Sequence, residues 1–297
     1  MIFIITKDEL VSIIIILIIL SALIINSLYI VIFHTTVYSK IKKIIIKSKI
    51  INRIKAEKYF LKYQPIYDPR NNKVVGFEAL LRLFDKDNRV MAPLEFIPEI
   101  EKNNMLFDIS MWVVEKIIKD YSVIRQYDCV KDTTFYISFN ISLNEIENDN
   151  FVNKVIELLN KYNIGNNKIC LEVIERIKVS DSESLSKNIG ILKNSGFKIA
   201  IDDFGVEYSN LELIDKIDAD IIKIDKYFVD GLGKDELKDQ IILCIYKMAF
   251  IKNKLVILEG VEDKEQDRII KNAGYDFIYV QGYFYSKPID ILEIEKL

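Results

Sequence analysis

Acidic and amide side chains recur where short apolar stretches end in the C-terminal part of the chain. Six of them offer only oxygen ligands: Glu78, Asn140, Glu172, Asp202, Asp203 and Glu259. Oxygen ligands suit hard cations such as Mg²⁺ or Mn²⁺ and do not suit zinc. Carboxylates gathered at one place repel one another unless cations neutralise them. We therefore expect one or two divalent ions that polarise a phosphoryl group and lower the pKa of a bound water.

Other residues narrow the chemistry further. Lys223 closes a similar apolar stretch and could stabilise developing negative charge or hold the attacking water. The only histidine, His34, lies in an apolar N-terminal region, which excludes Ser/His/Asp and Cys/His catalysis and His-rich metal sites. The segment Asp203-Phe204-Gly205 also occurs in protein kinases, but the catalytic-loop histidine and the glycine-rich loop are missing. A single strand-end carboxylate is usually solvated or caps a helix, so the clustering carries the inference.

These residues must be brought together by alternating strands and helices. Beyond residue 56, apolar β-type runs end at Glu78, Asn140, Glu172, Asp202, Lys223, Glu259 and Gln281. Helical patterns fill residues 111–121, 150–162, 182–194, 235–250 and 264–272. This α/β alternation predicts a (β/α)8 TIM-like barrel, where catalytic groups collect at the C-terminal strand ends. An open doubly wound sheet is the rival, but no glycine-rich nucleotide loop follows any strand.

The first two candidate strands, residues 59–67 and 73–83, are separated only by residues 68–72. So short a connection joins antiparallel strands, because a parallel pair needs a longer crossover. We therefore expect a modified barrel with an antiparallel first strand, preceded by one transmembrane helix.

The N-terminal region has the composition of a membrane anchor. Residues 10–33 carry no charge and consist mostly of Ile, Leu and Val, and ~20 such residues suffice to cross a bilayer. A cleaved signal peptide is the alternative, but its apolar part is shorter and a small-residue cleavage site is lacking. Basic residues are concentrated after this stretch, which places the following domain in the cytoplasm. We expect an anchor at residues 1–36, a basic juxtamembrane linker at 37–55 and a catalytic domain at 56–297 on the cytoplasmic side of the cell membrane.

Charge and cysteine usage exclude other classes of function. The formal net charge is −3, although nine Lys and Arg residues stand against Glu57 alone between Lys40 and Lys62. The rest is acidic, which argues against binding of a DNA or RNA polymer. Residues 41–55 alternate Ile and Lys, as in an amphipathic helix on anionic headgroups or a basic stop-transfer flank. We expect the three cysteines, Cys129, Cys170 and Cys244, to be buried, inert thiols.

The motifs, taken together, resemble the EAL domain family of cyclic di-GMP phosphodiesterases over residues 57–297. The name-giving segment is Glu78-Ala79-Leu80-Leu81-Arg82. In the family's order there follow Asn140-Ile141-Ser142, Leu171-Glu172-Val173-Ile174-Glu175, Asp202-Asp203-Phe204-Gly205, Lys223-Ile224-Asp225, Glu259-Gly260-Val261-Glu262 and Gln281-Gly282-Tyr283.

This resemblance implies a role for each matching residue. It implies a first metal on Glu78, Asn140, Glu172 and Asp202, and a second on Asp202 and Asp203. It implies catalytic roles for Glu259, as general base or metal ligand, for Lys223 beside the attacking water, and for Gln281. It implies substrate contacts from Gln64, Leu81, Arg82 and Glu262, and a loop-bracing role for Glu175. The implied reaction opens cyclic di-GMP to linear pGpG with Mg²⁺ or Mn²⁺, and the family also implies a homodimer.

Two departures from the family pattern leave an alternative open. The loop after Asp203 reads Val206, Glu207 and Asn210 where the family has Thr, Gly and Ser, and losing the glycine restrains the backbone. The segment between Gly274 and Gln281 is about two residues longer than usual. The alternative to an active enzyme is therefore a catalytically silent EAL domain that binds cyclic di-GMP or a partner. Separately from these departures, an unrelated metal-dependent barrel hydrolase is a third hypothesis.

Overall fold

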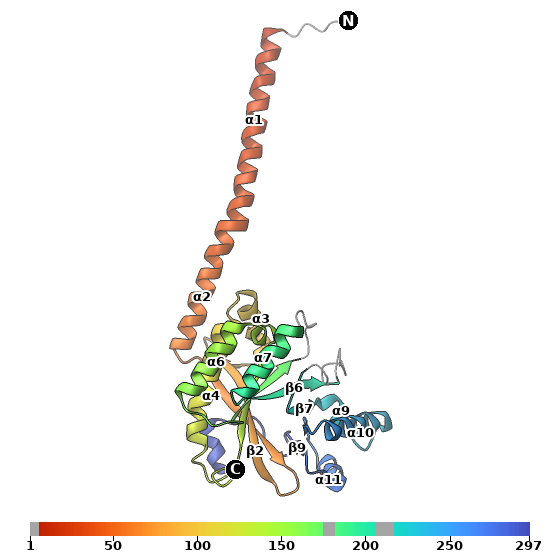
Figure 1. Ribbon diagram of the computed structural model, residues 1–297. Coiled ribbons are helices and arrows are strands. Elements are labelled where there is room, and N and C mark those ends of the chain that lie inside the picture. Colours follow the sequence, from red (N-terminus) through yellow and green to blue (C-terminus); the bar gives the residue numbers. More distant parts are fainter. Residues whose placement is uncertain (1–5, 175–181, 206–216) are drawn as a thin grey trace. The chain divides into compact units, whose positions relative to one another are not determined.

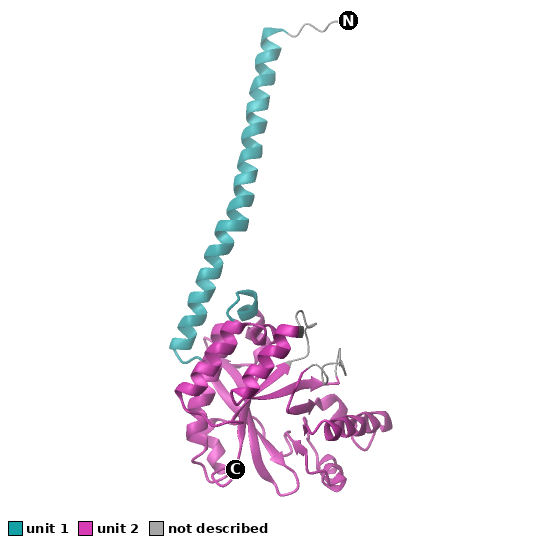
Figure 2. Cartoon of the chain, viewed as in Figure 1, with its two compact units in different colours: residues 1–58, 99–105 teal, residues 59–98, 106–297 magenta. Residues whose placement is uncertain are grey.

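The computed structural model describes residues 6–174, 182–205 and 217–297 of the chain. The chain forms two compact units (Figure 2). One comprises residues 1–58 and 99–105, and the other comprises residues 59–98 and 106–297.

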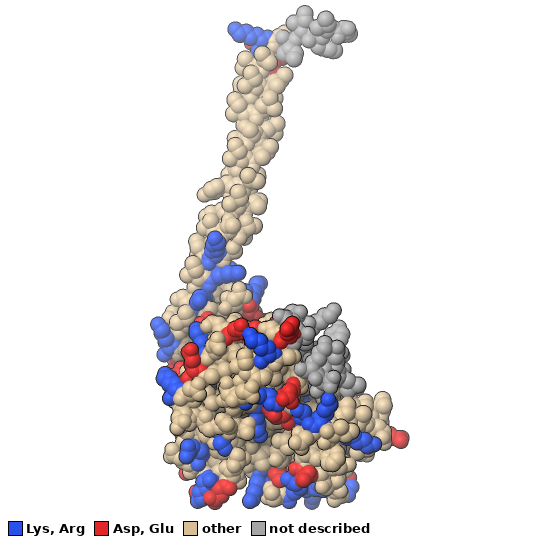
Figure 3. Space-filling view, viewed as in Figure 1, with Lys and Arg blue, Asp and Glu red and all other residues tan. Residues whose placement is uncertain are grey.

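The first unit is dominated by a long helix. Helix α1 (Lys7–Ile32), the π-helical turn η1 (Phe33–Tyr38) and α2 (Ser39–Lys55) follow one another without a break (Figure 1). Thr6 and Glu9 cap its start reciprocally through their side chains and backbone N–H groups. No residue of α1 is buried, and most of its length is free of charged atoms on the face shown in Figure 3. The helix is long and apolar enough to span a membrane, a property that it shares with signal sequences.

The basic residues of the expected linker lie on α2. Lys49 Nζ and Arg53 Nη1 lie 3.5 and 3.8 Å from the carboxylate of Glu99, which belongs to the same unit. These side chains are partly exposed, so each pair contributes at most about 1 kcal/mol. A headgroup-binding helix and a basic flank are both compatible with a helical α2, and both stay predictions.

The second unit is a closed barrel of eight strands. The strands are β1 (Tyr59–Asp68), β2 (Lys73–Phe84), β4 (Tyr136–Ile141), β5 (Ile169–Ile174), β6 (Lys198–Phe204), β7 (Ile221–Ile224), β8 (Leu255–Leu258) and β9 (Ile278–Val280). They are hydrogen-bonded in the order β1-β9-β8-β7-β6-β5-β4-β2, and β2 returns to β1. A short strand, β3 (Val90–Met91), pairs with the end of β2.

The first strand runs against its neighbours, as predicted. β1 is antiparallel to both β2 and β9, whereas the pairs from β2–β4 around to β8–β9 are parallel. The modified TIM-like barrel is therefore confirmed. The second strand, predicted at residues 73–83, is β2 (Lys73–Phe84). Glu78, which closes an apolar run in the sequence, therefore lies inside this strand and not at its end.

Helices alternate with the strands along the chain (Figure 1). The described ones are α3 (Pro93–Lys102), α4 (Leu106–Ile124), α5 (Leu143–Ile146), α6 (Asp149–Lys161), α7 (Ser182–Asn194), α9 (Lys226–Val229), α10 (Glu236–Ile251), α11 (Lys264–Ala273) and η2 (Ile291–Lys296). All five predicted helices are present, and α7 has the predicted bounds. The prediction missed α3, which contains Pro98. It also missed the four-residue helices α5 and α9, because a single turn carries too little periodicity to be recognised.

Apolar side chains fill the interior of the barrel below the polar strand ends. One cluster of buried residues consists of Ile66, Tyr136, Cys170, Ala200, Ile221 and Ile257. The barrel is thus a packed core that holds its rim rigidly. Burial of Cys170 is as predicted, but Cys129 is only partly buried and Cys244 is exposed on α10. The prediction was wrong for Cys244, because this residue lies with Leu243 on the exposed face of α10, whereas Ile242 and Ile245 are buried.

Two glycines should respond in opposite ways to alanine. A Cβ on Gly282 would lie 2.1 to 2.6 Å from backbone atoms of Val261, whereas a Cβ on Gly190, inside α7, would meet no atom within 4 Å. Gly282→Ala should therefore lower the free energy of unfolding by at least about 2 kcal/mol through overpacking. Gly190→Ala should raise it by about 0.5–1 kcal/mol, because alanine favours the helix. Urea unfolding would check both, and equal effects would contradict the packing around Gly282.

Candidate active site

Lys223 lies at the centre of the polar groups at the C-terminal strand ends. Its Nζ lies 2.8 Å from Glu172 Oε2, 2.9 Å from Asp202 Oδ1, 2.7 Å from Glu259 Oε1 and 3.6 Å from Glu78 Oε2. The lysine comes from β7, and the four carboxylates come from β5, β6, the residue after β8, and β2. The lysine side chain is only 1% exposed. Four carboxylates and one ammonium leave an excess of negative charge, which suits additional cations.

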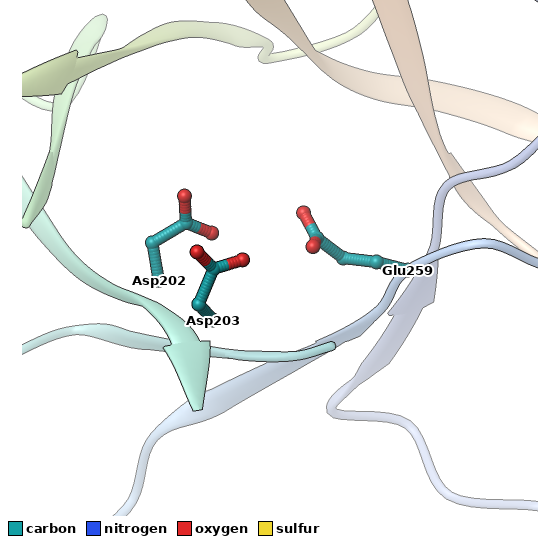
Figure 4. A group of neighbouring side chains, drawn as sticks. All are labelled: Asp202, Asp203 and Glu259. Atoms are coloured by element: carbon teal, nitrogen blue, oxygen red, sulfur yellow. The ribbon is translucent and has the colours of Figure 1, made fainter. Parts of the chain in front are cut away.

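A break in strand β6 lets two consecutive aspartates serve one place. Adjacent residues of a regular strand point to opposite faces. The pairing of β6 with β7 shifts register between Ile201 and Phe204, and Asp203 adopts a left-handed conformation with φ 52°. Asp202 and Asp203 consequently both face Glu259 (Figure 4).

These three carboxylates form a candidate metal cluster. One carboxylate oxygen from each of Asp202, Asp203 and Glu259 lies within 4.8 Å of the other two. The sequence had placed Glu259 beside the water, with metal ligation as the other reading. The position of Glu259 next to the two aspartates favours the second of these roles, metal ligation.

Glu78 connects the predicted ligand Asn140 with the predicted catalytic residue Gln281. Its Oε1 accepts a hydrogen bond from Asn140 Nδ2 at 3.2 Å, and its Oε2 accepts one from Gln281 Nε2 at 2.7 Å. Glu78 and Gln281 are buried, whereas Asn140, the next-to-last residue of β4, is exposed. All eight predicted catalytic and metal-binding residues thus stand at one rim of the barrel.

Burial and mutual repulsion disturb the ionisation of this group. Burial raises the pKa of Glu172 and of Glu259 above the usual range of a glutamate, although Lys223 opposes the shift. Burial alone would lower the pKa of Lys223, but Asp202, Glu172, Glu259 and Glu78 together raise it well above its ordinary value. The surrounding carboxylates thus favour the charged form of Lys223.

The residues fit a divalent ion. The donor set consists of carboxylate and amide oxygens, which Mg²⁺ and Mn²⁺ prefer. Among the described residues, the buried atoms Glu172 Oε1 and Gln281 Oε1 accept no hydrogen bond. A buried acceptor without a donor is costly, so an ion or a water at this place would relieve both.

The predicted substrate contacts lie on β1, β2 and the loop after β8. Gln64 is paired in register with Glu78, and its Nε2 donates to the carbonyl of Ser286 at 3.3 Å. Arg82 lies two positions beyond Leu80 and four beyond Glu78, hence on the same strand face, and its Nη1 donates to the Leu81 carbonyl at 2.9 Å. The same alternation puts the Leu81 side chain on the opposite face, so only its backbone could serve the site.

The sequence also drew attention to Glu175, to the changed loop after Asp203 and to the lengthened segment before Gln281. Glu175 and the changed loop with Val206, Glu207 and Asn210 lie outside the described residues. The long segment before Gln281 does not displace that residue from Glu78. Instead, its Tyr275 and Phe277 form aromatic contacts with Tyr246 of α10, at 5.5 and 6.4 Å between ring centroids.

Comparison with known proteins agrees with this geometry. A sequence model described as the EAL domain matches residues 48–288. The chain belongs to the EAL domain family. The first helix α1 lies outside the match, and the EAL domain covers the whole barrel.

Several relatives of this EAL domain are known. The signaling protein YkoW of Bacillus subtilis is 29% identical over 243 residues, or 82% of this chain and 30% of YkoW. The probable cyclic di-GMP phosphodiesterase PdeA of Escherichia coli is 32% identical over 225 residues, or 76% of this chain and 30% of PdeA. The chain thus spans about a third of the length of these relatives.

A solved structure shares the fold. The EAL enzyme Bd1971, in its form with cAMP and cyclic di-GMP bound, has a TM-score of 0.78 and 28% identity, and the alignment covers 94% of this chain and 74% of that one. The EAL family depends on divalent metal, and the cluster of Asp202, Asp203 and Glu259 could bind it.

The sequence prediction missed one charged residue at the rim of this EAL domain. Lys226 opens α9 and pairs with Glu262, which follows β8. Its spacing of three residues from Lys223 could have indicated it, because Glu262 likewise follows Glu259 by three.

Proposed function

We propose that this protein is a metal-dependent phosphodiesterase that hydrolyses cyclic di-GMP to linear pGpG and so lowers the concentration of this second messenger. The observation that carries the proposal is the convergence of four carboxylates on buried Lys223 at the rim of an EAL barrel. The relatives whose names specify cyclic di-GMP phosphodiesterases support the choice of substrate.

Glu78, Asn140, Glu172 and Asp202 would hold a first Mg²⁺ or Mn²⁺, and Asp202 with Asp203 a second. Such ions, when bound, supply a polarised phosphoryl group and a water of lowered pKa. Glu259 stands next to the two aspartates and can serve the same ions or accept a proton.

The chain's own residues account for the rest of the reaction. Water attacks phosphorus, the bond from phosphorus to the ribose 3′ oxygen breaks, and the 5′ phosphate remains on pGpG. Where Glu259 serves as general base, it would accept the proton of the attacking water, and the 3′ oxygen would take up a proton from solvent as it leaves. Lys223 donates from Nζ toward the attacking oxygen and the developing charge, while Gln281 orients Glu78 through its amide.

Substrate binding would use residues on both sides of the rim. Arg82 would contact a phosphate, Gln64 and Glu262 the nucleotide portions, and Leu81 would contribute through its backbone. Glu175 would brace the loop that follows Asp203. A homodimer of two barrels is proposed from membership of the EAL family alone.

The same proposal covers the location of the enzyme. We propose that residues 1–36 anchor it in the bacterial inner membrane as a single-pass helix, with residues 37–55 as the linker and the catalytic domain 56–297 in the cytoplasm. Support comes from the uncharged length of α1 and from the basic residues that follow it on α2.

Turnover by the full-length chain in detergent micelles tests the function. We expect pGpG to appear from cyclic di-GMP with Mg²⁺ or Mn²⁺, and to fall to background with excess EDTA. Tight binding of cyclic di-GMP without product would support the silent receptor instead, and would direct attention to Glu207. Hydrolysis of other phosphodiesters in preference to cyclic di-GMP would point to the unrelated hydrolase.

A further inference from the structure

A second Glu–Lys pair lies beside the catalytic one. Lys223 and Glu259 form the inner pair, and Lys226 and Glu262, each three residues further along the chain, form an outer pair. The inner lysine is 1% exposed, whereas both outer side chains are 43% exposed. Three residues span at most about 10 Å, so the outer pair lies within the reach of a nucleotide whose phosphate occupies the inner site.

The outer lysine is held in place by its surroundings. Gly260 has φ 69°, and a Cβ on it would lie 2.3 to 2.7 Å from Cγ, Cβ and Cδ of Lys226. The aliphatic part of Lys226 thus lies flat against the bare backbone of Gly260, and its ammonium meets Glu262 Oε1. Glu262 itself is fixed from the other side, because its backbone N–H donates to Gln266 Oε1 at 2.7 Å.

The outer pair presents acceptors and donors side by side. A carboxylate accepts two parallel N–H groups, and an ammonium carries three donors, of which Glu262 takes one. Guanine offers the matching edge, with donors on N1 and N2 and an acceptor at O6. Adenine offers a lone pair on N1, a donor on N6 and no amino group on C2. The adenine lone pair would face the carboxylate and its amino group the ammonium, so both contacts would be repulsive.

We propose that Lys226 is a specificity-determining residue that donates to O6 of a substrate guanine while Glu262 accepts from N1 and N2. This inference rests on the proposed hydrolysis of cyclic di-GMP and identifies how the base is selected. It assigns a role to a residue that the catalytic reaction does not require.

Kinetics of the full-length protein in micelles with Mn²⁺ test the assignment. Lys226→Met should raise KM for cyclic di-GMP about tenfold, the effect of one partly exposed charge-assisted hydrogen bond, with kcat within about twofold. Cyclic di-IMP keeps O6 and N1–H, so its KM should rise equally. The KM or inhibition constant of cyclic di-AMP should not rise. Lys226→Arg, whose side chain keeps the methylenes that lie on Gly260, should retain most of the guanine preference.

The matched control is Lys234→Met. Lys234 is an exposed lysine paired at 3.5 Å with Asp263, the residue next to Glu262, and its loss changes the net charge equally. We expect wild-type KM from this variant. An unchanged KM in Lys226→Met would overturn the assignment, and so would an equal loss for cyclic di-AMP, which would make Lys226 a phosphate contact. If the wild type neither binds nor hydrolyses cyclic di-GMP, the proposed function fails together with this inference.

Discussion

Lys223→Met should leave a protein that is unstable without divalent ions and inactive with them. The substitution removes the one ammonium in contact with Glu172, Asp202, Glu259 and Glu78. Removing one partner of a buried ion pair costs about 3–5 kcal/mol, because the remaining charge is left without compensation. In EDTA the melting temperature should therefore fall steeply relative to wild type.

Divalent ions should reverse most of this loss. An ion that binds the folded state stabilises it in proportion to RT ln(1 + [L]/Kd), and the carboxylates of Lys223→Met attract cations more strongly than those of wild type. Mn²⁺ should thus raise the melting temperature of the variant more than that of wild type. Turnover should stay at least about 10²-fold lower with saturating Mn²⁺, because the donor toward the reacting oxygen is gone.

Lys254→Met is the matched control. Lys254 is also largely buried, with 15% of its side chain exposed, but it pairs at 2.7 Å with Asp218, whose side chain is 69% exposed. Water can solvate Asp218 when the lysine is lost, so the cost should stay within about 1 kcal/mol and should not depend on Mn²⁺. A Lys223→Met variant that melts like wild type in EDTA would refute the central role of this ammonium.

The sequence predicted the barrel because seven apolar runs in it are each closed by a polar residue. Apart from β2, the corresponding strands end within two residues of that position. The rim chemistry was visible for the same reason, since parallel strands bring their ends to one place. Glu78 differs from the other rim residues, because it lies inside the strand predicted at residues 73–83 and observed as β2, which pairs with β1 along its length.

Backbone irregularities and the geometry of contacts between side chains could not be predicted in this way. The left-handed conformation of Asp203 is one example, because no local signal distinguishes a bulge in β6 from a regular strand end. The contact geometry of Lys226 and Glu262 is another. Their spacing in the sequence could have pointed to the two residues, but their contact joins the first turn of α9 to the segment after β8 and depends on the space left by Gly260. Such features follow from which strands are neighbours, and neighbours are fixed only by the closed barrel.

Glu78→Ala should abolish turnover while leaving the barrel folded. Glu78 accepts hydrogen bonds from Asn140 at 3.2 Å and Gln281 at 2.7 Å, so its loss removes a proposed metal ligand and releases two others of the site. Unlike Lys223, it leaves no uncompensated charge, because Lys223 keeps three closer carboxylates. We expect pGpG formation to fall by at least about 10³-fold, as when a group acting with the metal is lost, with a melting temperature in EDTA close to that of wild type.

Two further variants separate chemistry from packing. Glu78→Gln keeps the volume of the side chain and one acceptor oxygen but removes the negative charge. It should therefore still hold Gln281 or Asn140 in place. If Glu78 serves to bind metal, this variant should nevertheless lose most turnover. Cys170→Ala opens a small cavity in the buried cluster below the rim and should lower stability by about 1 kcal/mol while turnover remains measurable. Full activity in Glu78→Ala would show that the rim carboxylates are not the reaction centre, because no other described residue joins Asn140, Gln281 and the Lys223 group into one site.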